Sequence, residues 1–330
     1  MRYIVTFFNS YAGMYVAQSF CHSLITAVIA GRALSVWDIR DPVARQRFRL
    51  LVILVPIFSF PLYQLINPSR SLPQFRLQAL FDVNRWLTLE VWGFFPVGLM
   101  FLALLTSTAV VFLVQEMIPV LKHSAQSRSS RPEGRRHAPN SFVESFAKAL
   151  SVDTPEIVIL DDDEAVLFSI TGKRPAICIS SGLMALLTPE QVRAAFAHEV
   201  AHIARSRRPL LIAVFLLRII MFYNPVTLVK FRHAVRDEEK ICDDIAVSLT
   251  GDPGALAGAL EKFLHKQPDL PDLQHQNMQA FTSSLEEKNH NLHLESRIKR
   301  LQQVRPETGR GTGPLIAALA ATVVINYFIV

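Results

Sequence analysis

The chain has 330 residues, of which 50% are hydrophobic and 19% are charged, and its formal net charge is +6 at pH 7. This composition is too apolar for an ordinary soluble domain of this length and predicts several membrane segments. Basic residues that flank those segments next to anionic lipid explain the positive charge, and basic and aromatic residues do not interleave, so we exclude a nucleic-acid-binding protein.

Four stretches are candidates for membrane-spanning helices. They are Tyr11–Ala30, Leu50–Ile66, Trp92–Val114 and Pro314–Val330. The first is the weakest because four polar side chains interrupt it: Gln18, Ser19, His22 and Thr26. We expect these side chains to face other helices; the alternative is a buried or interfacial helix.

Basic residues predict the orientation of these spans. Five arginines lie between the first two spans and five basic residues follow the third, whereas the intervening loop has Arg70, Arg76 and Arg85. Loops rich in basic residues stay in the cytoplasm. We therefore expect both chain termini outside and the region between the third and last spans in the cytoplasm.

A basic segment separates the third span from the next domain. Residues 122–140 are rich in Ser, Arg, Pro and Gly, and we interpret them as a flexible linker. Three short apolar runs then predict strands at 157–160, 165–171 and 176–180, the last two joined by a hairpin at 172–175. The sequence thus predicts a small sheet beside a helical core, with an edge able to bind an extended peptide by strand addition.

A helix is expected to begin near Pro189. Thr188 and Gln191 form a capping box around this proline, which fits the first helical position. Apolar side chains then recur at helical spacing, so the residues of the run His198-Glu199-Val200-Ala201-His202 occupy the third and fourth turns. The two imidazoles therefore project from one side of the helix, one turn apart.

The pattern H-E-x-x-H on a helix is how zinc metallopeptidases hold metal and activate water. His198 and His202 supply two ligands, and Glu199 is placed to act as the general base. Two imidazoles and a water leave a zinc site one protein ligand short, so a carboxylate, His or Cys must come from elsewhere. The alternative without metal is a helix with two histidines satisfied in the core or on the surface.

The apolar stretch 209–223 resembles a further membrane span. A crossing there would place His198 and a downstream ligand on opposite sides of the bilayer, where one metal ion cannot bind both. Its length of about 15 residues, the charge of Arg218 and the break at Asn224-Pro225 favour a re-entrant, interfacial or buried helix. We therefore expect the site near the inner leaflet.

The third ligand is expected from the helical stretch after Pro225. Glu239 and Asp243 lie four residues apart on one side of it, beside an apolar stripe, where a carboxylate is costly unless it is paired or binds metal. We predict Glu239 as the third ligand and Asp243 as the partner that fixes the tautomer of His198. Periodicity does not separate Glu239 from Glu238; only the residue four positions on decides, which is Asp243 for Glu239 and Cys242 for Glu238. Cys242 itself is another candidate ligand.

These residues resemble a known family. HEVAH, Asn224-Pro225 and Glu239-x-x-Cys242-Asp243 are similar to the BlaR/MecR-type membrane zinc metallopeptidases (gluzincins), and more distantly to the HtpX-type proteases with their E-x-x-x-D signature. The paired strands and the element Glu295–Leu301, which contains R-I-x-x-L, extend the resemblance over residues 140–304. The family's antibiotic-sensing domain would follow the last membrane helix. Because the sequence stops at Val330, we expect no such domain and do not carry over β-lactam sensing.

The expected fold is a mainly α membrane protein with about four transmembrane helices and a cytosolic α+β metallopeptidase domain. We expect a membrane region at 1–121, the linker at 122–140, the peptidase domain at 141–304 with an embedded or interfacial helix at 209–223, and a last membrane helix at 305–330. Three widely spaced cysteines predict no disulfide framework.

Residues and resemblance together predict an integral zinc metalloendopeptidase of a bacterial-type inner membrane, with Zn2+ as cofactor and a regulatory role. Its expected partners are the lipid bilayer and a protein or peptide substrate, such as a cytosolic repressor or the chain's own linker. An HtpX-like quality-control protease is the enzymatic alternative. A non-catalytic membrane receptor or scaffold is the alternative of another class, and the presence of Glu199 argues against it.

Overall fold

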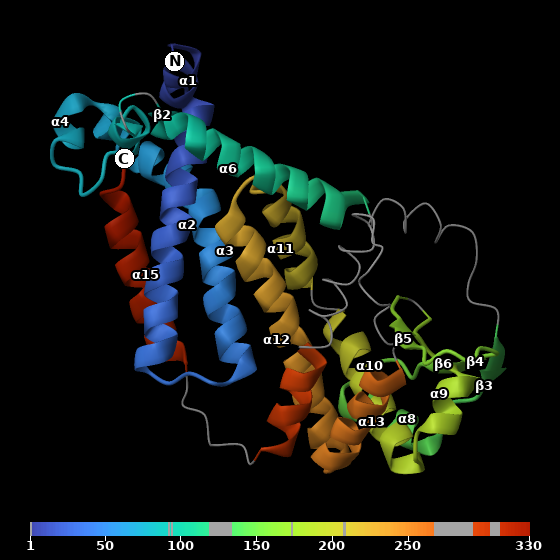
Figure 1. Cartoon of the computed structure of the whole chain (residues 1–330). Helices are drawn as coiled ribbons and strands as arrows, with labels where there is room; N and C mark the ends of the chain where they lie inside the picture. Colours follow the sequence, from blue (N-terminus) through green and yellow to red (C-terminus); the bar gives the residue numbers. More distant parts are fainter. Residues whose placement is uncertain are drawn as a thin grey trace. The chain divides into compact units, whose positions relative to one another are not determined.

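The structure is a computed structural model of a mainly helical chain (Figure 1). The chain divides into two compact units: unit 1 comprises residues 1–129, 210–238 and 308–330, and unit 2 comprises residues 130–209 and 239–307. The residues that the structure describes are 2–91, 93, 95–118, 134–172, 174–206, 209–266, 293–303 and 311–330.

Unit 1 contains the membrane segments. α2 (Tyr11–Val36), α3 (Pro42–Ile66) and α6 (Val97–Phe112), which η2 (Leu113–Met117) continues, are long and apolar enough to cross a membrane. α15 (Thr312–Tyr327) is apolar but shorter. A membrane protein with three apolar spans in its N-terminal part is thus confirmed, while the fourth span stays a prediction. The smaller elements are α1 (Arg2–Asn9), η1 (Pro68–Ser71), α4 (Pro73–Arg76), α5 (Val83–Leu87), β1 (Glu90–Val91) and β2 (Phe95–Pro96).

The third span begins later than the sequence predicted. β1 and β2 pair as a small antiparallel hairpin, so the chain is still extended where we expected helix, and α6 starts at Val97. Gly93 in the turn of this hairpin has a φ of 75°, a conformation that favours glycine. Trp92, the expected first residue of the span, lies outside the described residues.

The polar side chains of α2 face other helices, as expected. All four are at most 1% exposed: Gln18, Ser19, His22 and Thr26. His22 Nδ1 lies 2.7 Å from Ser59 Oγ of α3, and Asn326 Nδ2 of α15 donates a hydrogen bond to Thr26 Oγ1 (3.3 Å). Polar groups within a membrane segment need such partners because lipid offers none.

α11 (Pro209–Ile220) and α12 (Pro225–Thr250) form a helical hairpin beside α3 (Figure 1). With 12 residues, α11 is about 18 Å long, too short for a hydrocarbon core of about 30 Å. At the tip, Asn224 Oδ1 accepts the N–H of Val226 (3.0 Å), and Asn224 Nδ2 donates to Ser23 Oγ of α2 (2.9 Å). The chain therefore turns back here, and the expectation that this segment does not cross the membrane stays a prediction.

The charge within α11 is neutralised by its neighbours. Arg218 is 1% exposed and forms an ion pair with Glu116 of η2. Its guanidinium also lies over the ring of Phe231, 4.3 Å from the ring centroid. A buried arginine is tolerated because contacts of its guanidinium with a carboxylate and an aromatic ring compensate for the hydration that it loses on burial.

Unit 2 combines a four-stranded sheet with helices. The strand order is β3-β4-β6-β5; β4 and β6 are parallel, and each outer strand is antiparallel to its neighbour. The strands are β3 (Arg135–His137), β4 (Glu156–Leu160), β5 (Leu167–Ile170) and β6 (Ala176–Ser180). The helices are α8 (Ser141–Ala149), α9 (Ser181–Leu186), α10 (Pro189–Ser206), α12 from Glu239 onward, α13 (Pro253–Lys266) and a helix at residues 293–302.

The three predicted strands are confirmed, and a fourth was missed. β3 lies within the predicted linker 122–140, where it pairs with β4 through main-chain hydrogen bonds that its polar sequence did not indicate. Residues 122–133 of that linker lie outside the described part of the chain, as do residues 119–121 and 267–292.

β6 lies at the centre of the core of unit 2. Ile177 and Ile179 are fully buried and belong to one apolar cluster with residues of α10 and α13, among them Ala197, Val200 and Leu256. Packing of α10 against the sheet leaves its other side for the site described below.

The start of α10 is fixed by the predicted capping box. Thr188 N donates to Gln191 Oε1 (3.1 Å), and Gln191 N donates to Thr188 Oγ1 (3.3 Å). Two otherwise unpaired N–H groups are thereby satisfied. The cap therefore sets the first turn of the helix that carries His198 and His202.

Replacing Thr188 by Ala should loosen the first turn of α10. The variant lacks the hydroxyl that accepts the Gln191 N–H, and loss of such a cap costs about 1 kcal/mol. Hydrogen–deuterium exchange of the full chain should then show the Gln191 amide exchanging about fivefold faster. Thr188→Ser keeps the acceptor and should exchange like the wild type. Equal exchange in Thr188→Ala and the wild type would show that the cap does not hold this turn.

Candidate metal centre

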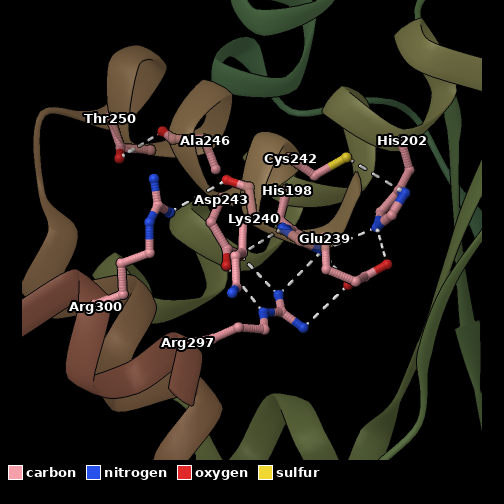
Figure 2. Close-up of polar contacts among 10 residues, drawn as sticks. All are labelled: His198, His202, Glu239, Lys240, Cys242, Asp243, Ala246, Thr250, Arg297 and Arg300. Carbon is pink, nitrogen blue, oxygen red and sulfur yellow. Dashed lines mark hydrogen bonds and ion pairs between the residues drawn. The ribbon is translucent and has the colours of Figure 1, made fainter. Parts of the chain in front are cut away.

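α10 and α12 bring three metal-binding side chains of unit 2 together (Figure 2). His198 Nε2 lies 3.0 Å from His202 Nε2. The Glu239 carboxylate reaches both rings, 3.6 Å from His198 Nε2 and 3.4 Å from His202 Nε2. Glu238, the alternative that periodicity left open, instead accepts a hydrogen bond from Gln46 Nε2 (2.7 Å). Of the two glutamates, Glu239 is therefore the one beside the imidazoles.

Two further residues of α12 contact the far nitrogens of the imidazoles. Asp243 Oδ1 lies 3.1 Å from His198 Nδ1, and Cys242 Sγ lies 3.5 Å from His202 Nδ1. Both side chains are fully buried. A partner at Nδ1 holds the ring proton there and leaves the lone pair of Nε2 for a metal. Cys242, the other candidate ligand, thus contacts the nitrogen of His202 that faces away from the donor group.

A guanidinium from the helix at 293–302 completes the site. Arg297 Nε and Nη2 donate to the two oxygens of Asp243 (2.9 and 2.7 Å), and Arg297 Nη1 donates to Glu239 Oε2 (3.0 Å) (Figure 2). Charge-assisted bonds in this two-pronged geometry are among the strongest in proteins. One cation therefore balances both carboxylates that α12 places near the imidazoles.

The next turn of that helix is also bonded to α12. Arg300 Nη2 donates to Asp244 Oδ2 (2.6 Å), and Arg300 Nη1 donates to the carbonyl oxygen of Lys240 (3.4 Å). Apolar side chains anchor the same helix in the core: Leu294, Ile298 and Leu301. Arg297 is thus presented by a helix that is fixed on two sides.

These charges shift the pKa values of the site. Burial lowers the pKa of His198, but the carboxylates of Asp243 and Glu239 outweigh burial and raise it to about 9. Burial raises the pKa of Asp243, but Arg297 and His198 outweigh burial and lower it to about 2. The pKa of Glu239 is also well below its ordinary value, because the two imidazoles and Arg297 outweigh burial. Both carboxylates are therefore ionised at neutral pH.

The donor set fits a zinc ion. Zinc binds imidazole nitrogen and carboxylate oxygen at about 2.0–2.1 Å, and tetrahedral geometry then separates neighbouring donor atoms by roughly 3.3 Å. The two imidazole nitrogens lie 3.0 Å apart, and each lies near one oxygen of Glu239: His198 Nε2 is 3.6 Å from Oε2, and His202 Nε2 is 3.4 Å from Oε1. Each of these pairs is close to the separation that a shared zinc ion requires. Two imidazole lone pairs 3.0 Å apart repel each other unless a proton or a cation lies between them.

A cavity of about 230 Å³ opens onto the donor atoms. Glu199, beside His198 in the chain, lines it and is 8% exposed. The rest of its polar lining is the donor group and Arg297. Its apolar wall includes Leu167 of β5 and three side chains of α13: Leu256, Leu260 and Phe263. The arrangement can hold a cation, place a carboxylate beside it and receive an apolar group.

Sequence reasoning missed Arg297 and the contact of Cys242 with His202. Arg297 stands in the element 295–301, which was noted for its resemblance to a family and given no role in the site. A signal was available: a basic residue directly precedes Ile298 and lies four residues before Leu301, on a helix with a buried side. Only the packed structure shows that this cation faces Asp243 and Glu239.

Comparison with known proteins finds similarity to peptidases. Residues 94–252 match the family described as BlaR1 peptidase M56. The chain is 37% identical over 67 residues to the protease HtpX of Psychrobacter sp. (strain PRwf-1). The matched residues are 19% of this chain and 22% of that protein. It is 26% identical over 167 residues to a protease HtpX homolog of Caldanaerobacter subterraneus subsp. tengcongensis. This match covers 37% of this chain and 55% of that protein. No solved structure matches this chain.

The chain spans about half or less of the length of these curated relatives. A protease HtpX homolog of Listeria welshimeri is 28% identical over 117 residues, covering 34% of this chain and 38% of that protein. At low identity, these matches confirm the resemblance to membrane metallopeptidases of the BlaR1 and HtpX type, and they support a protease.

Replacing Arg297 by Gln should weaken zinc binding. The variant leaves Asp243 buried without its cation, and loss of such a supporting partner lowers metal affinity by about 10–100-fold. Chelator competition on the purified full chain measures this affinity. Arg300→Gln is the matched control, since it removes an arginine of the same helix that pairs with Asp244 outside the donor group. Its zinc affinity should fall much less than that of Arg297→Gln. Equal affinities for Arg297→Gln and Arg300→Gln would contradict the role given to Arg297.

Zinc affinity should depend on pH through His198. With a pKa of about 9, this ring carries a proton at pH 7 until zinc displaces it. The apparent affinity should therefore rise about tenfold per pH unit from pH 7 to about 8.5 and flatten above about 9. Calorimetry at pH 7 in two buffers of different ionisation enthalpy should detect about one proton released per zinc. An affinity that does not change over this range would refute the assignment of His198 as a ligand.

Proposed function

We propose that this chain, a membrane protein whose residues 94–252 match the BlaR1 peptidase M56 family, is a zinc-dependent endopeptidase. Its substrate would be a cytosolic or membrane-proximal protein. The convergence of His198, His202 and Glu239 on one point carries this proposal. In it these three residues are the zinc ligands, and Glu199 is the general base. The fold, the cavity and the similarity to proteases support it.

Zinc held by these residues would supply Lewis acidity, which polarises the scissile carbonyl group and makes a water molecule easier to deprotonate. Glu199 takes a proton from the attacking water onto its carboxylate and later delivers it to the nitrogen of the leaving amine. Asp243 keeps the proton of His198 on Nδ1, and Cys242 does the same for His202, so that both rings present Nε2. Arg297 holds the carboxylates of α12 in position.

The surroundings of the cavity suggest how a protein substrate is bound. β5 is an outer strand of the sheet, and its first residue, Leu167, lines the cavity. An extended peptide can pair with an outer strand through main-chain hydrogen bonds, which are tolerant of sequence. The apolar wall formed by Leu256, Leu260 and Phe263 would then select the side chain next to the scissile bond.

Two roles for the protease are proposed in order of preference. The arginine-rich loops support a cytoplasmic active site in a bacterial inner membrane, and the similarity to the BlaR1 family supports a regulatory protease that cleaves a repressor-like protein or itself. The relatives named HtpX favour a second candidate, a quality-control protease of the membrane. Proteome comparison of cells carrying wild type or Glu199→Ala separates them. A few uncut proteins favour regulation, and many accumulating damaged membrane proteins favour quality control.

Replacing Glu199 by Ala should abolish proteolysis and spare zinc. The carboxylate moves protons and does not hold the metal in this proposal, so activity should fall at least 100-fold, while zinc content matches the wild type. His202→Ala and Glu239→Ala should lose both zinc and activity. Zinc analysis with a self-cleavage and peptide-library assay in detergent measures both properties. Full activity in Glu199→Ala would refute the base, and zinc binding without cleavage by the wild type would indicate the scaffold alternative.

A further inference from the structure

A second cavity lies within unit 1, at the ends of α1, α4 and α5. Its volume is about 290 Å³, which suits a small organic molecule. One wall is formed by residues 76–88, called the wall segment here. Main-chain hydrogen bonds to the last residue hold it in place: Val330 N donates to Phe81 O (2.9 Å), and Val83 N donates to Val330 O (2.5 Å). Six lining side chains matter here: Phe8, Asn9, Arg76, Asp82, Asn84 and Arg85.

Two arginines of this cavity form no ion pair with any residue that the structure describes: Arg76 and Arg85. Arg76 Nε is buried and has no acceptor. By contrast, Arg49 of the same unit pairs with Asp237, and Arg70 donates to the carbonyl oxygen of Tyr327 (2.9 Å). A buried donor without an acceptor is costly. Arg76 Nε is therefore placed to donate to an anionic group, and the exposed Arg85 adds a second positive charge to the same lining.

The same cavity also offers acceptors. Asn84 is 7% exposed, and its Nδ2 donates to Asn9 Oδ1 (3.2 Å), whereas its own Oδ1 is buried and has no donor. The carboxylate of Asp82 lies on the same wall, where one oxygen accepts the N–H of Arg85 (3.1 Å). An unsatisfied acceptor beside a carboxylate favours a ligand that carries N–H donors and positive charge.

We infer that this cavity binds a small zwitterion, with its anionic group on Arg76 and Arg85 and its ammonium group on Asp82 and Asn84. A single anion would leave Asn84 Oδ1 unpaired, and a single cation would leave Arg76 Nε unpaired. The buried ring of Phe8 supplies an apolar contact for the atoms between the charges.

Two sources share this chemistry: a free amino acid and the headgroup of a phosphatidylethanolamine lipid. The wall segment has apolar side chains on its exposed surface, with Leu77 87%, Leu80 69% and Trp86 51% exposed. Exposed leucines and a tryptophan near cationic residues are typical of a segment that lies at a membrane interface. A position at the interface would bring lipid headgroups close to this cavity.

Binding to the purified full chain in detergent tests the inference. Calorimetry with O-phosphoethanolamine, leucine and inorganic phosphate should show that at least one of the two zwitterions binds at least tenfold more tightly than phosphate. Arg76→Met should weaken that binding at least tenfold. Asp82→Ser should do the same, since serine keeps the cap of α5 but removes the charge. Arg47→Met, which removes an exposed arginine of α3 remote from this cavity, should bind like the wild type.

Lipid nanodiscs separate the two sources. Native mass spectrometry of chain taken from mixed phosphatidylethanolamine and phosphatidylcholine nanodiscs should show retained phosphatidylethanolamine if the headgroup is the ligand, and less of it in Arg76→Met. Retention of neither lipid, with leucine bound, would identify the free amino acid. Arg76→Lys, which keeps the charge but lacks Nε, should show intermediate binding if Arg76→Met does not fold. Phosphate binding as tightly as both zwitterions, no binding of either, or Asp82→Ser binding like the wild type would overturn the inference.

Discussion

Two carboxylates one turn apart on α12 impose the constraint on which unit 2 depends. Asp243 is fully buried, and the side chain of Glu239 is 35% exposed. Breaking a buried ion pair by removing one partner costs about 3–5 kcal/mol. α10 meets this demand with the rings of His198 and His202, and the helix at 293–302 meets it with Arg297. The contacts that pack these three helices together are therefore the same contacts that hold the donor group for a metal in place.

The need to give every buried polar group a partner also shapes unit 1, whose membrane segments have lipid in place of water around them. Polar side chains of α2 point inward and bond to α3, α15 and the tip of the α11–α12 hairpin. Arg218 is accommodated by Glu116 and an aromatic ring. Each buried polar contact also fixes one helix against another, so specificity of packing and satisfaction of polar groups come from the same residues.

Features that depend on nearby residues could be predicted from the sequence, and features that depend on distant ones could not. The capping box sets α10 within four residues, so the phase of His198 on that helix was predictable. The choice of Glu239 over Glu238 depended on Asp243, four residues on, because both glutamates border the apolar stripe. The contact of Glu238 with Gln46, from a distant helix, could not be predicted. Arg297 lies 58 residues beyond Glu239, and no periodicity links them. β3 was missed because its polar sequence gains its partners only from β4.

X-ray absorption at the zinc edge of the purified full chain tests the central claim most directly. We predict a first shell of nitrogen and oxygen at about 2.0–2.1 Å with two imidazoles, and loss of the bound zinc in Glu239→Ala. We also predict no sulfur, because Cys242 contacts the far nitrogen of His202. A zinc–sulfur distance of about 2.3 Å, or a zinc environment unchanged in Glu239→Ala, would contradict the central claim.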